Sequence, residues 1–319
     1  MNSIVMTGFW LVVIMWFPCI SSGALSPVFY AKTCPKALQI IEQVVREAVK
    51  NEQRAGASLL RLHFHDCFVQ GCDASILLDK TATIDSEKFS LANNLSIRGF
   101  EIIDRIKSAV DQACPGPVVS CADIVAVAAR DGVVALGGPS WKVALGRRDS
   151  TTASRTLADA SLPSPFMELT ALIQNFKNQG LSKKDLVTLS GGHTVGFAQC
   201  GSFRQRIYND TNIDAGFADS LKGNCGVSGG DSNLAGLDFT PAKFDPNYYQ
   251  KIVVKKGLLH SDQALQDSGS TSSLVKKFSG NSGAFSKAFA KSMVKMGNIK
   301  PLTGTAGQIR KNCRVVNAN

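Results

Sequence analysis

The stretch that decides the fold of this chain reads Arg61-Leu-His-Phe-His-Asp-Cys-Phe-Val-Gln-Gly-Cys-Asp-Ala-Ser75. On a helix, Arg61 and His65 are four residues apart and share a face, whereas His63 points elsewhere. Histidine can transfer protons near neutral pH, and arginine keeps its positive charge while it stabilises developing negative charge. The pattern predicts a base and a fixed cation that face one cavity.

The same stretch carries oxygen ligands and two cysteines. Asp66, Asp73 and Ser75 surround a tight, glycine-containing loop, which suits a hard cation such as Ca²⁺. Cys67 and Cys72 are spaced so that a disulfide would close this loop. A zinc site is not expected, because Zn²⁺ prefers cysteine and histidine together in a closed tetrahedron, and these cysteines are better used as a disulfide.

A second histidine lies in the segment Ser190-Gly-Gly-His-Thr-Val-Gly196. A single histidine among glycines is by default a loop or core residue, so this segment alone does not establish a ligand. The chain has only 4 histidines, however. One lies beside an arginine and another among glycines, where a flat ligand could approach closely, which suggests a cofactor held between two histidines.

Composition limits the class of protein. The chain has 319 residues, a formal net charge of +10 and 44% hydrophobic residues. It is too apolar for a disordered tail and has no collagen-like glycine period, and it is long enough for one large domain or two ordinary ones. Its lysines and arginines are spread out without aromatic interleaving, so nucleic acid is not an expected partner. An acidic polysaccharide is favoured, and a simply solvated basic surface is the alternative.

The N-terminus resembles a secretory signal peptide. The apolar run from Phe9 to Ile20 is followed by small residues, and we expect cleavage near Gly23. The run is shorter than the roughly 20 residues of a membrane-spanning helix. Residues 1–23 are therefore assigned to the signal and 24–319 to one domain. That domain keeps an even number of cysteines, as expected for disulfides in an oxidising compartment. The N-x-[ST] sequons at Asn94 and Asn209 agree with export.

Hydrophobic periodicity indicates an all-α domain with long loops. Strand signals are sparse, and apolar and polar residues alternate only weakly over 141–145. The polar stretch 209–237 is predicted to be a surface loop. Ser182 and Asp185 form a capping-box pattern at the start of one helix. Apolar residues at spacings of three and four predict helices over 37–49, 100–113, 166–176 and 285–296, and the stretch 122–129, which is apolar nearly all round, predicts a buried helix.

One rival motif is present. Gly226-Val-Ser-Gly-Gly230 matches the G-x-S-x-G pattern of serine hydrolases, with Ser228 as the nucleophile. It lies in a polar loop without the strand-to-helix turn that this motif requires, so we attribute the match to chance.

Over essentially all of residues 24–319, the chain resembles the secreted plant haem peroxidases, also called class III peroxidases, and its charge is that of a cationic member. The likeness rests on many motifs in order: Leu25-Ser-Pro-Val-Phe-Tyr, Thr33-Cys-Pro, Arg61 to Ser75, Arg98-Gly-Phe-Glu, Ser120-Cys-Ala-Asp-Ile, Leu145-Gly-Arg-Arg-Asp, Leu162-Pro-Ser-Pro, Leu189-Ser-Gly-Gly-His-Thr-Val-Gly, Phe244-Asp and Gly257-Leu-Leu-His-Ser-Asp.

This resemblance implies a mostly helical haem-peroxidase fold, in which one haem b lies between a distal and a proximal half. It also implies few short strands, a buried ion pair between Asp123 and Arg147, and a monomer. The four disulfides carried over are Cys34–Cys114, Cys67–Cys72, Cys121–Cys313 and Cys200–Cys225.

The resemblance also implies the roles of the site residues. His193 would be the proximal haem-iron ligand, and Asp262 would accept its other ring N–H. Arg61 and His65 would be the distal pair that cleaves H₂O₂. Phe64 would be the aromatic side chain of the distal pocket, and Asn93 would orient His65 through a hydrogen bond. Pro163 would belong to the site that binds the phenolic donor.

Two structural Ca²⁺ sites are implied. The distal site would use the side chains of Asp66, Asp73 and Ser75 and the carbonyls of Val69 and Gly71, with Glu87 holding its water shell. The proximal site would use Thr194, Asp238, Thr240 and Asp245 with a carbonyl near Lys243. Here the chain departs from the family pattern, because one residue rather than two separates Asp238 from Thr240.

The resemblance favours the cell wall or extracellular space, since the chain ends six residues after Cys313 without a long extension. A catalytically silent wall protein on the same scaffold is the alternative from another class.

Overall fold

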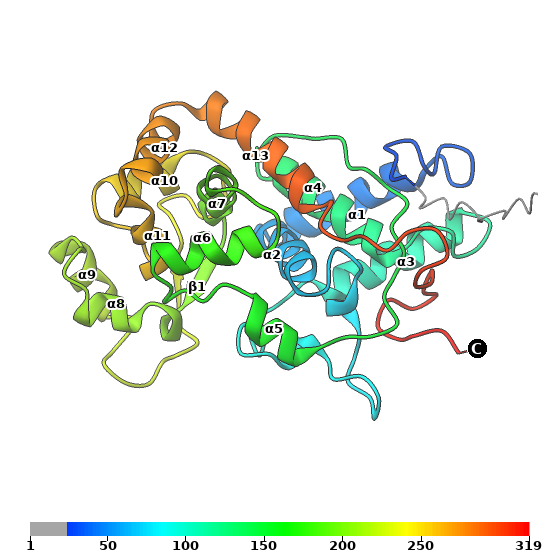
Figure 1. The fold of residues 1–319 in the computed structure, drawn as a ribbon, viewed down its shortest axis with the longest axis horizontal. Coiled ribbons are helices and arrows are strands. Elements are labelled where there is room, and N and C mark those ends of the chain that lie inside the picture. Colours follow the sequence, from blue (N-terminus) through cyan, green and yellow to red (C-terminus); the bar gives the residue numbers. More distant parts are fainter. Residues whose placement is uncertain (1–23, 319) are drawn as a thin grey trace, which may run out of the picture.

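The computed structural model describes residues 24–318, and these fold into a mostly helical structure (Figure 1). The predicted signal peptide, residues 1–23, lies outside the described residues. Among the helices of the described part, none has the length and apolar character needed to cross a membrane.

The described residues contain α-helices, short 3-10 helices and two short strands. The α-helices are α1 (Ala37–Asn51), α2 (Arg54–Val69), α3 (Phe100–Ala113), α4 (Cys121–Ala135), α5 (Arg155–Ser161), α6 (Leu169–Asn178), α7 (Lys183–Ser190), α8 (Arg204–Asn209), α9 (Ala215–Lys222), α10 (Asn247–Val253), α11 (His260–Gln263), α12 (Gly269–Ser279) and α13 (Ser282–Met296). The 3-10 helices are Ser75–Leu77, Glu87–Phe89, Gly191–Thr194, Cys200–Ser202 and Ala264–Gln266, and the strands are β1 (Phe197–Gln199) and β2 (Leu234–Gly236).

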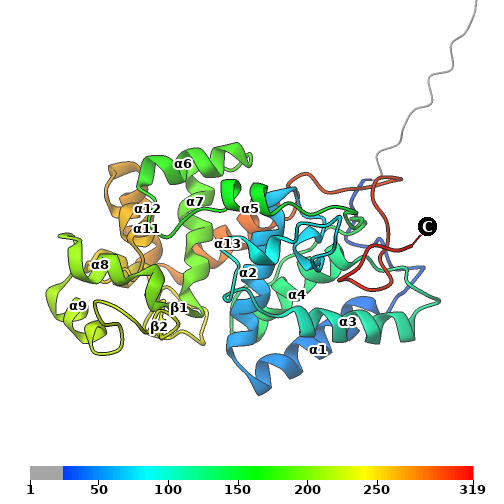
Figure 2. The ribbon, with the colours of Figure 1, turned by 90° about the horizontal axis from the view of Figure 1, so that it is seen from below.

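The helices form two halves (Figure 2). α1, α3 and α4 lie in one half, α6 to α12 lie in the other, and α2 and α13 lie between them. α2 packs most extensively against α4. At their contact, a Cβ placed on Gly56 would lie 2.9 Å from the carbonyl oxygen of Gly132. A larger residue at either position would push the helices apart, so these two glycines set where α2 crosses α4.

The second half is built around aromatic side chains. Phe244, Tyr249, Phe285 and Phe289 contact one another with ring centroids 4.9 to 5.7 Å apart. The 3-10 helix Gly191–Thr194 lies directly on this cluster. A Cβ at the first glycine of that helix would collide with the Tyr249 hydroxyl and with the Phe285 ring, so only glycine fits there.

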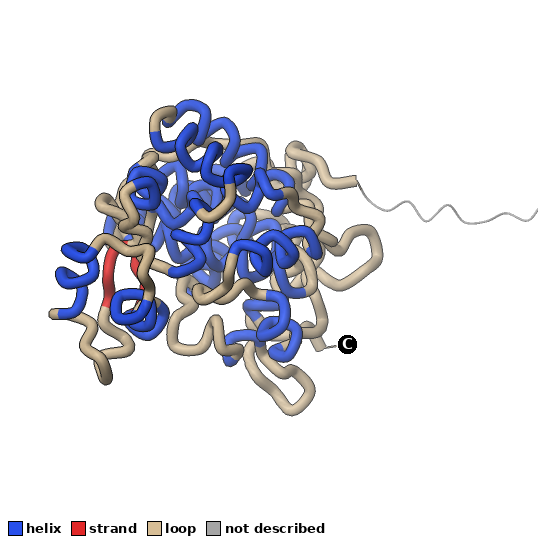
Figure 3. Tube along the Cα trace, turned by 60° about the vertical axis from the view of Figure 1, so that its left-hand side comes forward, coloured by secondary structure: helices blue, strands red, loops and turns tan. Residues whose placement is uncertain are grey.

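A smaller core lies at one end of the molecule, beside the strands drawn red in Figure 3. β1 and β2 pair antiparallel, with Phe197 opposite Gly236. Its buried members are Cys200, Phe203, Ile207, Ala218, Cys225, Leu237, Leu258 and Leu259.

The sequence predicted α1, α3, α4, α6, α7 and α13, and the Ser182–Asp185 capping box is present, but the eleven-residue helix α12 was not predicted. Three predictions need correction. Residues 209–237 are not a continuous loop, because α9 and β2 lie within them; Asp214 caps α9, which buries Ala218. The helix predicted from residue 166 begins at Leu169, and Phe166 is 47% exposed. Residues 141–145 form no strand, and Leu145 makes only one isolated bridge, to Ser26.

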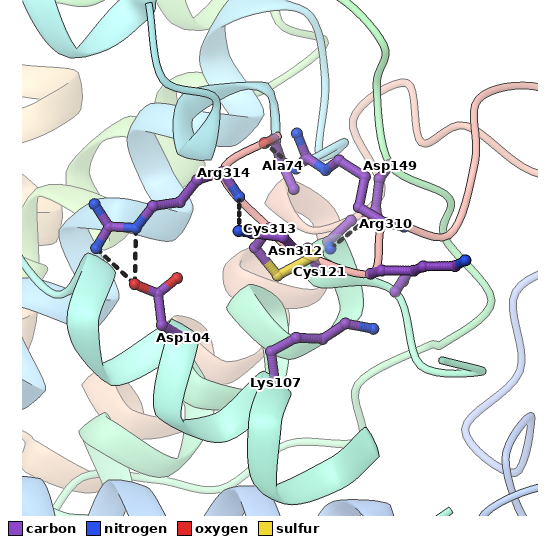
Figure 4. Close-up of a disulfide and its surroundings, with 12 residues drawn as sticks. Ala74, Asp104, Lys107, Cys121, Asp149, Arg310, Asn312, Cys313 and Arg314 are labelled. Atoms are coloured by element: carbon purple, nitrogen blue, oxygen red, sulfur yellow. Dashed lines mark hydrogen bonds and ion pairs between the residues drawn. A yellow bond between two sulfur atoms is a disulfide. The ribbon is translucent and has the colours of Figure 1, made fainter. Parts of the chain in front are cut away.

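All four predicted disulfides are present. They are Cys34–Cys114, Cys67–Cys72, Cys121–Cys313 and Cys200–Cys225. Figure 4 shows how Cys121–Cys313 fastens the C-terminal segment to the first half. Beside it, Arg314 pairs with Asp104 of α3 at 2.6 Å, and the backbone N–H of Arg310 donates to Asp149. A segment with little regular structure is thus held by covalent, ionic and backbone contacts.

The expected ion pair between Asp123 and Arg147 is present and fully buried. Arg147 Nη1 lies 2.8 Å from Asp123 Oδ1. The other carboxylate oxygen accepts hydrogen bonds from the Tyr30 hydroxyl at 2.7 Å and from the Gly146 N–H at 2.6 Å. Loss of either partner would therefore leave the charge of the other one buried without its counter-ion.

We expect Arg147→Met to reduce the free energy of unfolding by about 3–5 kcal/mol, because it leaves the Asp123 carboxylate buried without its cation. Urea unfolding of the holoprotein would measure this. Arg46→Met is the matched control: Arg46 pairs with Glu42 on the surface at 2.7 Å, and its loss should cost less than about 1 kcal/mol. Equal losses in the two variants would contradict the prediction.

Candidate active site

Arg61 and His65 meet on one face of α2, as their spacing predicts. Arg61 Nε lies 3.2 Å from His65 Nε2 and donates to it. The other ring nitrogen, Nδ1, lies 2.5 Å from Asn93 Oδ1. The Asn93 side-chain N–H donates to the carbonyl of Glu87, so its amide oxygen faces the ring and the proton of His65 sits on Nδ1. His65 Nε2 is thereby left as a proton acceptor.

Burial and charge keep His65 neutral. Burial lowers the pKa of His65 well below its ordinary value, and the charge of Arg61 lowers it further. The charge of His193 also lowers this pKa. Burial lowers the pKa of Arg61 to about 10, so the guanidinium still keeps its charge at neutral pH.

The Arg61 guanidinium is held by a loop that the sequence analysis did not identify. Its Nη1 donates to the carbonyl of Ser96 at 2.9 Å, and its Nη2 donates to the carbonyl of Ala92 at 2.7 Å and to Ser96 Oγ at 2.9 Å. Ser96 is also the third residue of the Asn94 sequon. Asn94 itself is exposed, as is Asn209 at the end of α8.

His193 is fixed by a buried carboxylate. His193 Nδ1 lies 2.8 Å from Asp262 Oδ1, and the buried Tyr248 hydroxyl donates to the same oxygen at 2.9 Å. The N–H of Leu259 donates to the other oxygen. With Nδ1 engaged and 39% of the side chain exposed, His193 has Nε2 free for a ligand. Tyr248 was not predicted, because nothing in its local sequence connects it to Asp262.

The remaining histidine of the α2 motif points elsewhere, as predicted. His63 Nδ1 lies 3.5 Å from Cys67 Sγ. Burial lowers the pKa of His63 to about 3, and the charge of Arg147 adds to this shift. His63, Cys67 and Cys72 lie together, but the two sulfurs are joined in a disulfide and cannot bind zinc as thiolates.

The predicted distal Ca²⁺ ligands form a buried cluster of oxygens. Asp66 Oδ1, Ser75 Oγ and Glu87 Oε2 have no hydrogen-bond partner among the described residues. Burial raises the pKa of Asp66, helped by the nearby charge of Asp73, and burial also raises the pKa of Glu87 to about 8. Unpartnered buried oxygens of this kind fit a hard cation.

The backbone positions predicted for this site lie next to it in sequence. Val69 ends α2, and Gly71 follows with a φ of 121°. A Cβ at Gly71 would collide with the carbonyl oxygen of Lys300, so this turn requires glycine.

The predicted proximal Ca²⁺ ligands also come together, including Asp238 and Thr240. Thr194 Oγ1 lies 2.8 Å from Asp238 Oδ2 and 2.7 Å from the carbonyl oxygen of Asp245. Thr240 Oγ1 lies 2.9 Å from Asp245 Oδ2. Burial raises the pKa of Asp238 to about 6, and Asp245 contributes to the rise. The one-residue shortening has therefore not removed either residue from the cluster.

The structure also gives the positions of the predicted distal aromatic, the donor-site proline, the proximal carbonyl and the rival motif. The Phe64 ring meets the His65 ring edge-to-face at 5.0 Å. Pro163 is half-buried on the link between α5 and α6. The Lys243 N–H donates to the carbonyl of Thr240. The rival motif, residues 226–230, lies in an exposed turn between α9 and β2.

A helical fold in which an arginine–histidine pair stands near a histidine tied to a carboxylate defines a haem peroxidase. The donor set fits haem, since His193 offers one free ring nitrogen. A family model described as peroxidase matches residues 41–281.

The chain is also similar to curated plant proteins over nearly its whole length. It is 57% identical over 300 residues to peroxidase RIP1 from Medicago truncatula, covering 93% of this chain and 92% of that protein. It is 57% identical over 295 residues to a lignin-forming anionic peroxidase from Nicotiana sylvestris, covering 92% and 91%, and 56% identical over 301 residues to peroxidase 70 from Zea mays, covering 93% and 94%. The chain belongs to the peroxidase family, in its plant class III branch. It is a haem-dependent oxidoreductase that reduces H₂O₂ with phenolic donors.

His260 ties the segment that carries Asp262 to two other elements. Its Nδ1 lies 2.8 Å from Asp210 Oδ2, and its Nε2 lies 3.1 Å from Glu168 Oε1. Asp210 follows α8 and Glu168 precedes α6. Burial alone would lower the pKa of His260, but the hydrogen bond and charge of Asp210, together with Glu168, outweigh burial and raise it.

We expect His260→Gln to remove a pH-dependent part of the stability. Because the folded pKa is raised, the stabilisation is complete below the unfolded pKa of about 6.5 and is lost as pH rises through the folded pKa. The difference in unfolding free energy between wild type and variant should be largest below about pH 6.5 and should shrink as the pH rises above it. Denaturant unfolding on both sides of this pH would test it, and parallel curves for the two proteins would rule it out.

Proposed function

We propose that the chain is a secreted peroxidase of the cell wall, in which residues 24–319 hold one haem b between His65 and His193 and two Ca²⁺ ions at the two oxygen clusters. The hydrogen bonds of the two histidine rings are the main support for this proposal. Each histidine has its Nδ1 engaged by a buried oxygen, of Asn93 or of Asp262, so Nε2 is the ring nitrogen left to act in each: in His65 it is a proton acceptor that accepts from Arg61 Nε, and in His193 it is open to a ligand.

A haem held by His193 would supply the two-electron chemistry that cleaves the O–O bond, with phenolic donors as the source of the electrons. The chain's own residues manage protons and charge. His65 Nε2 accepts a proton from one peroxide oxygen and delivers it to the other, which leaves as water. Its pKa is low, so the ring both accepts the proton and releases it readily.

Arg61 stabilises the negative charge that develops on the departing oxygen. Its hydrogen bonds to Ala92 and Ser96 fix the guanidinium before the reaction, so little reorganisation is needed. On the other side, Asp262 accepts the His193 Nδ1–H and raises the basicity of Nε2. A more basic ligand favours the electron-poor iron that the reaction requires.

The donors are small phenols, including precursors of wall polymers. One relative named above is a lignin-forming peroxidase, and Pro163, which we propose as part of the donor site, is half-buried on the link between α5 and α6. Four disulfides agree with an oxidising compartment. We also propose that the enzyme is a monomer, carries glycans at the exposed Asn94 and Asn209, and binds acidic wall polysaccharide through its basic surface.

The catalytic assignment is tested with His65→Ala. We expect the rate constant for reaction with H₂O₂ to fall by about 10²–10⁴-fold, because the proton acceptor is lost. Stopped-flow absorbance at the Soret band would measure it in haem-loaded protein. His63→Gln is the control, since His63 faces the Cys67 sulfur rather than the reaction centre. Similar rates for wild type and His65→Ala would favour the silent wall protein instead.

The distal calcium site is tested with Asp66→Asn. We expect metal analysis of the purified holoprotein to show one bound Ca²⁺ fewer than in wild type, together with a lower thermal midpoint, because a charged ligand is removed from a buried cluster. Asp79→Asn is the control, since the Asp79 side chain is 49% exposed and pairs with Lys88. Unchanged calcium content in Asp66→Asn would refute the ligand assignment.

A further inference from the structure

The positive charge of this chain is concentrated at its C-terminal end. The last acidic residue is Asp267, and residues 268–319 contain nine lysines and arginines and no aspartate or glutamate. Nine of the ten net positive charges therefore come from this segment. The nine residues are Lys276, Lys277, Lys287, Lys291, Lys295, Lys300, Arg310, Lys311 and Arg314.

Helix geometry aligns part of this charge. Lys287, Lys291 and Lys295 follow one another at intervals of four residues on α13, so they share a face with steps of about 6 Å. Lys287 and Lys291 are exposed and pair with no carboxylate of the described residues. Lys295 is compensated, because it pairs with Asp185 of α7 at 2.9 Å.

Lysines on neighbouring elements extend this row of positive charge. α12 and α13 are joined by a two-residue turn, and both contact α7. Lys183 Nζ at the start of α7 lies 3.1 Å from Ser270 Oγ at the start of α12. We call the resulting surface the basic face. It consists of six exposed lysines without a carboxylate partner in the described part of the chain: Lys183, Lys184, Lys276, Lys277, Lys287 and Lys291.

The basic face is separated from the reaction centre by the thickness of α13. The opposite side of that helix buries Phe285 and Phe289, which pack toward Gly191 and Gly192 beside His193. Figure 1 shows α12 and α13 along the upper edge of the molecule, away from α5 and the C-terminus. A ligand on the basic face would therefore lie across α13 from Gly191 and Gly192, and it would not lie on α2, which carries Arg61 and His65.

Six uncompensated ammonium groups repel one another, and a polyanion removes this repulsion. Lysine binds as a point charge and imposes no planar, two-pronged geometry, which suits carboxylates repeated along a chain. The aromatic side chains of α12 and α13, Phe278, Phe285 and Phe289, are all buried. The face therefore offers no stacking platform for nucleic-acid bases.

We propose that the basic face docks a linear polyuronate, an acidic polysaccharide with one carboxylate per sugar, and so holds the enzyme on the wall with its reaction centre free. This inference rests on the proposed secretion and gives the proposed polysaccharide binding a location.

The test compares two variants of the holoenzyme with equal net charge. The face variant carries Lys276→Gln, Lys277→Gln, Lys287→Gln and Lys291→Gln. The control carries Lys32→Gln, Lys50→Gln, Lys80→Gln and Lys142→Gln, four exposed lysines outside the basic face. Affinity for polygalacturonate is measured over a salt series. We expect the face variant to lose about tenfold or more in affinity at low salt, and the control to lose far less.

Three results would overturn the proposal. Equal losses in both variants would show that net charge alone binds the polymer. No binding by wild type at low salt would show that there is no such site. Equal, face-dependent affinity for single-stranded DNA or for anionic phospholipid vesicles would remove the commitment to polyuronate. Phenol oxidation by both variants is measured in parallel, so a failure of docking with normal turnover leaves the catalytic proposal standing.

Discussion

The site depends on one constraint, that each of two histidine rings has its Nδ1 bonded to a buried oxygen, which leaves Nε2 as the nitrogen that acts. For His65 the oxygen belongs to the Asn93 amide, and for His193 it belongs to the Asp262 carboxylate. The two partners differ in the charge they place on the ring. A neutral amide leaves His65 a weak base that can return its proton, whereas a carboxylate makes His193 a stronger donor to a metal.

The fold supplies these oxygens from distant parts of the chain. The close approach of Gly56 and Gly132 fixes α2, which carries His65, against α4. Asn93 reaches α2 from a loop whose carbonyls also hold Arg61, so one loop orients both distal groups. On the proximal side, the hydroxyl of Tyr248 on α10 buttresses Asp262 on α11. The catalytic geometry is thus a consequence of how helices and loops pack.

The sequence revealed the parts of this arrangement that are local. Arg61 and His65 could be paired from their spacing because a helix brings residues four apart to one face. Ser96 and Tyr248 could not, since their contacts to Arg61 and Asp262 span 35 and 14 residues and leave no periodic signal. α9 was not predicted because it has only eight residues, of which only Ala218 is fully buried. The ligand clusters came from family resemblance, and the structure shows their oxygens gathered.

The interior explains why the surface is so basic. Among the buried residues, nine are aspartate or glutamate and five are lysine or arginine. The interior therefore holds an excess of four negative charges, and the described surface is correspondingly more positive than the net charge of +10 suggests. Buried charges must be paired or bind metal. Part of this excess is paired with cations nearer the surface, since Asp131 pairs with Arg130 and Asp185 pairs with Lys295. The two Ca²⁺ ions that we propose would neutralise carboxylates of the two oxygen clusters, which leaves the lysines of the basic face to attract an external polyanion.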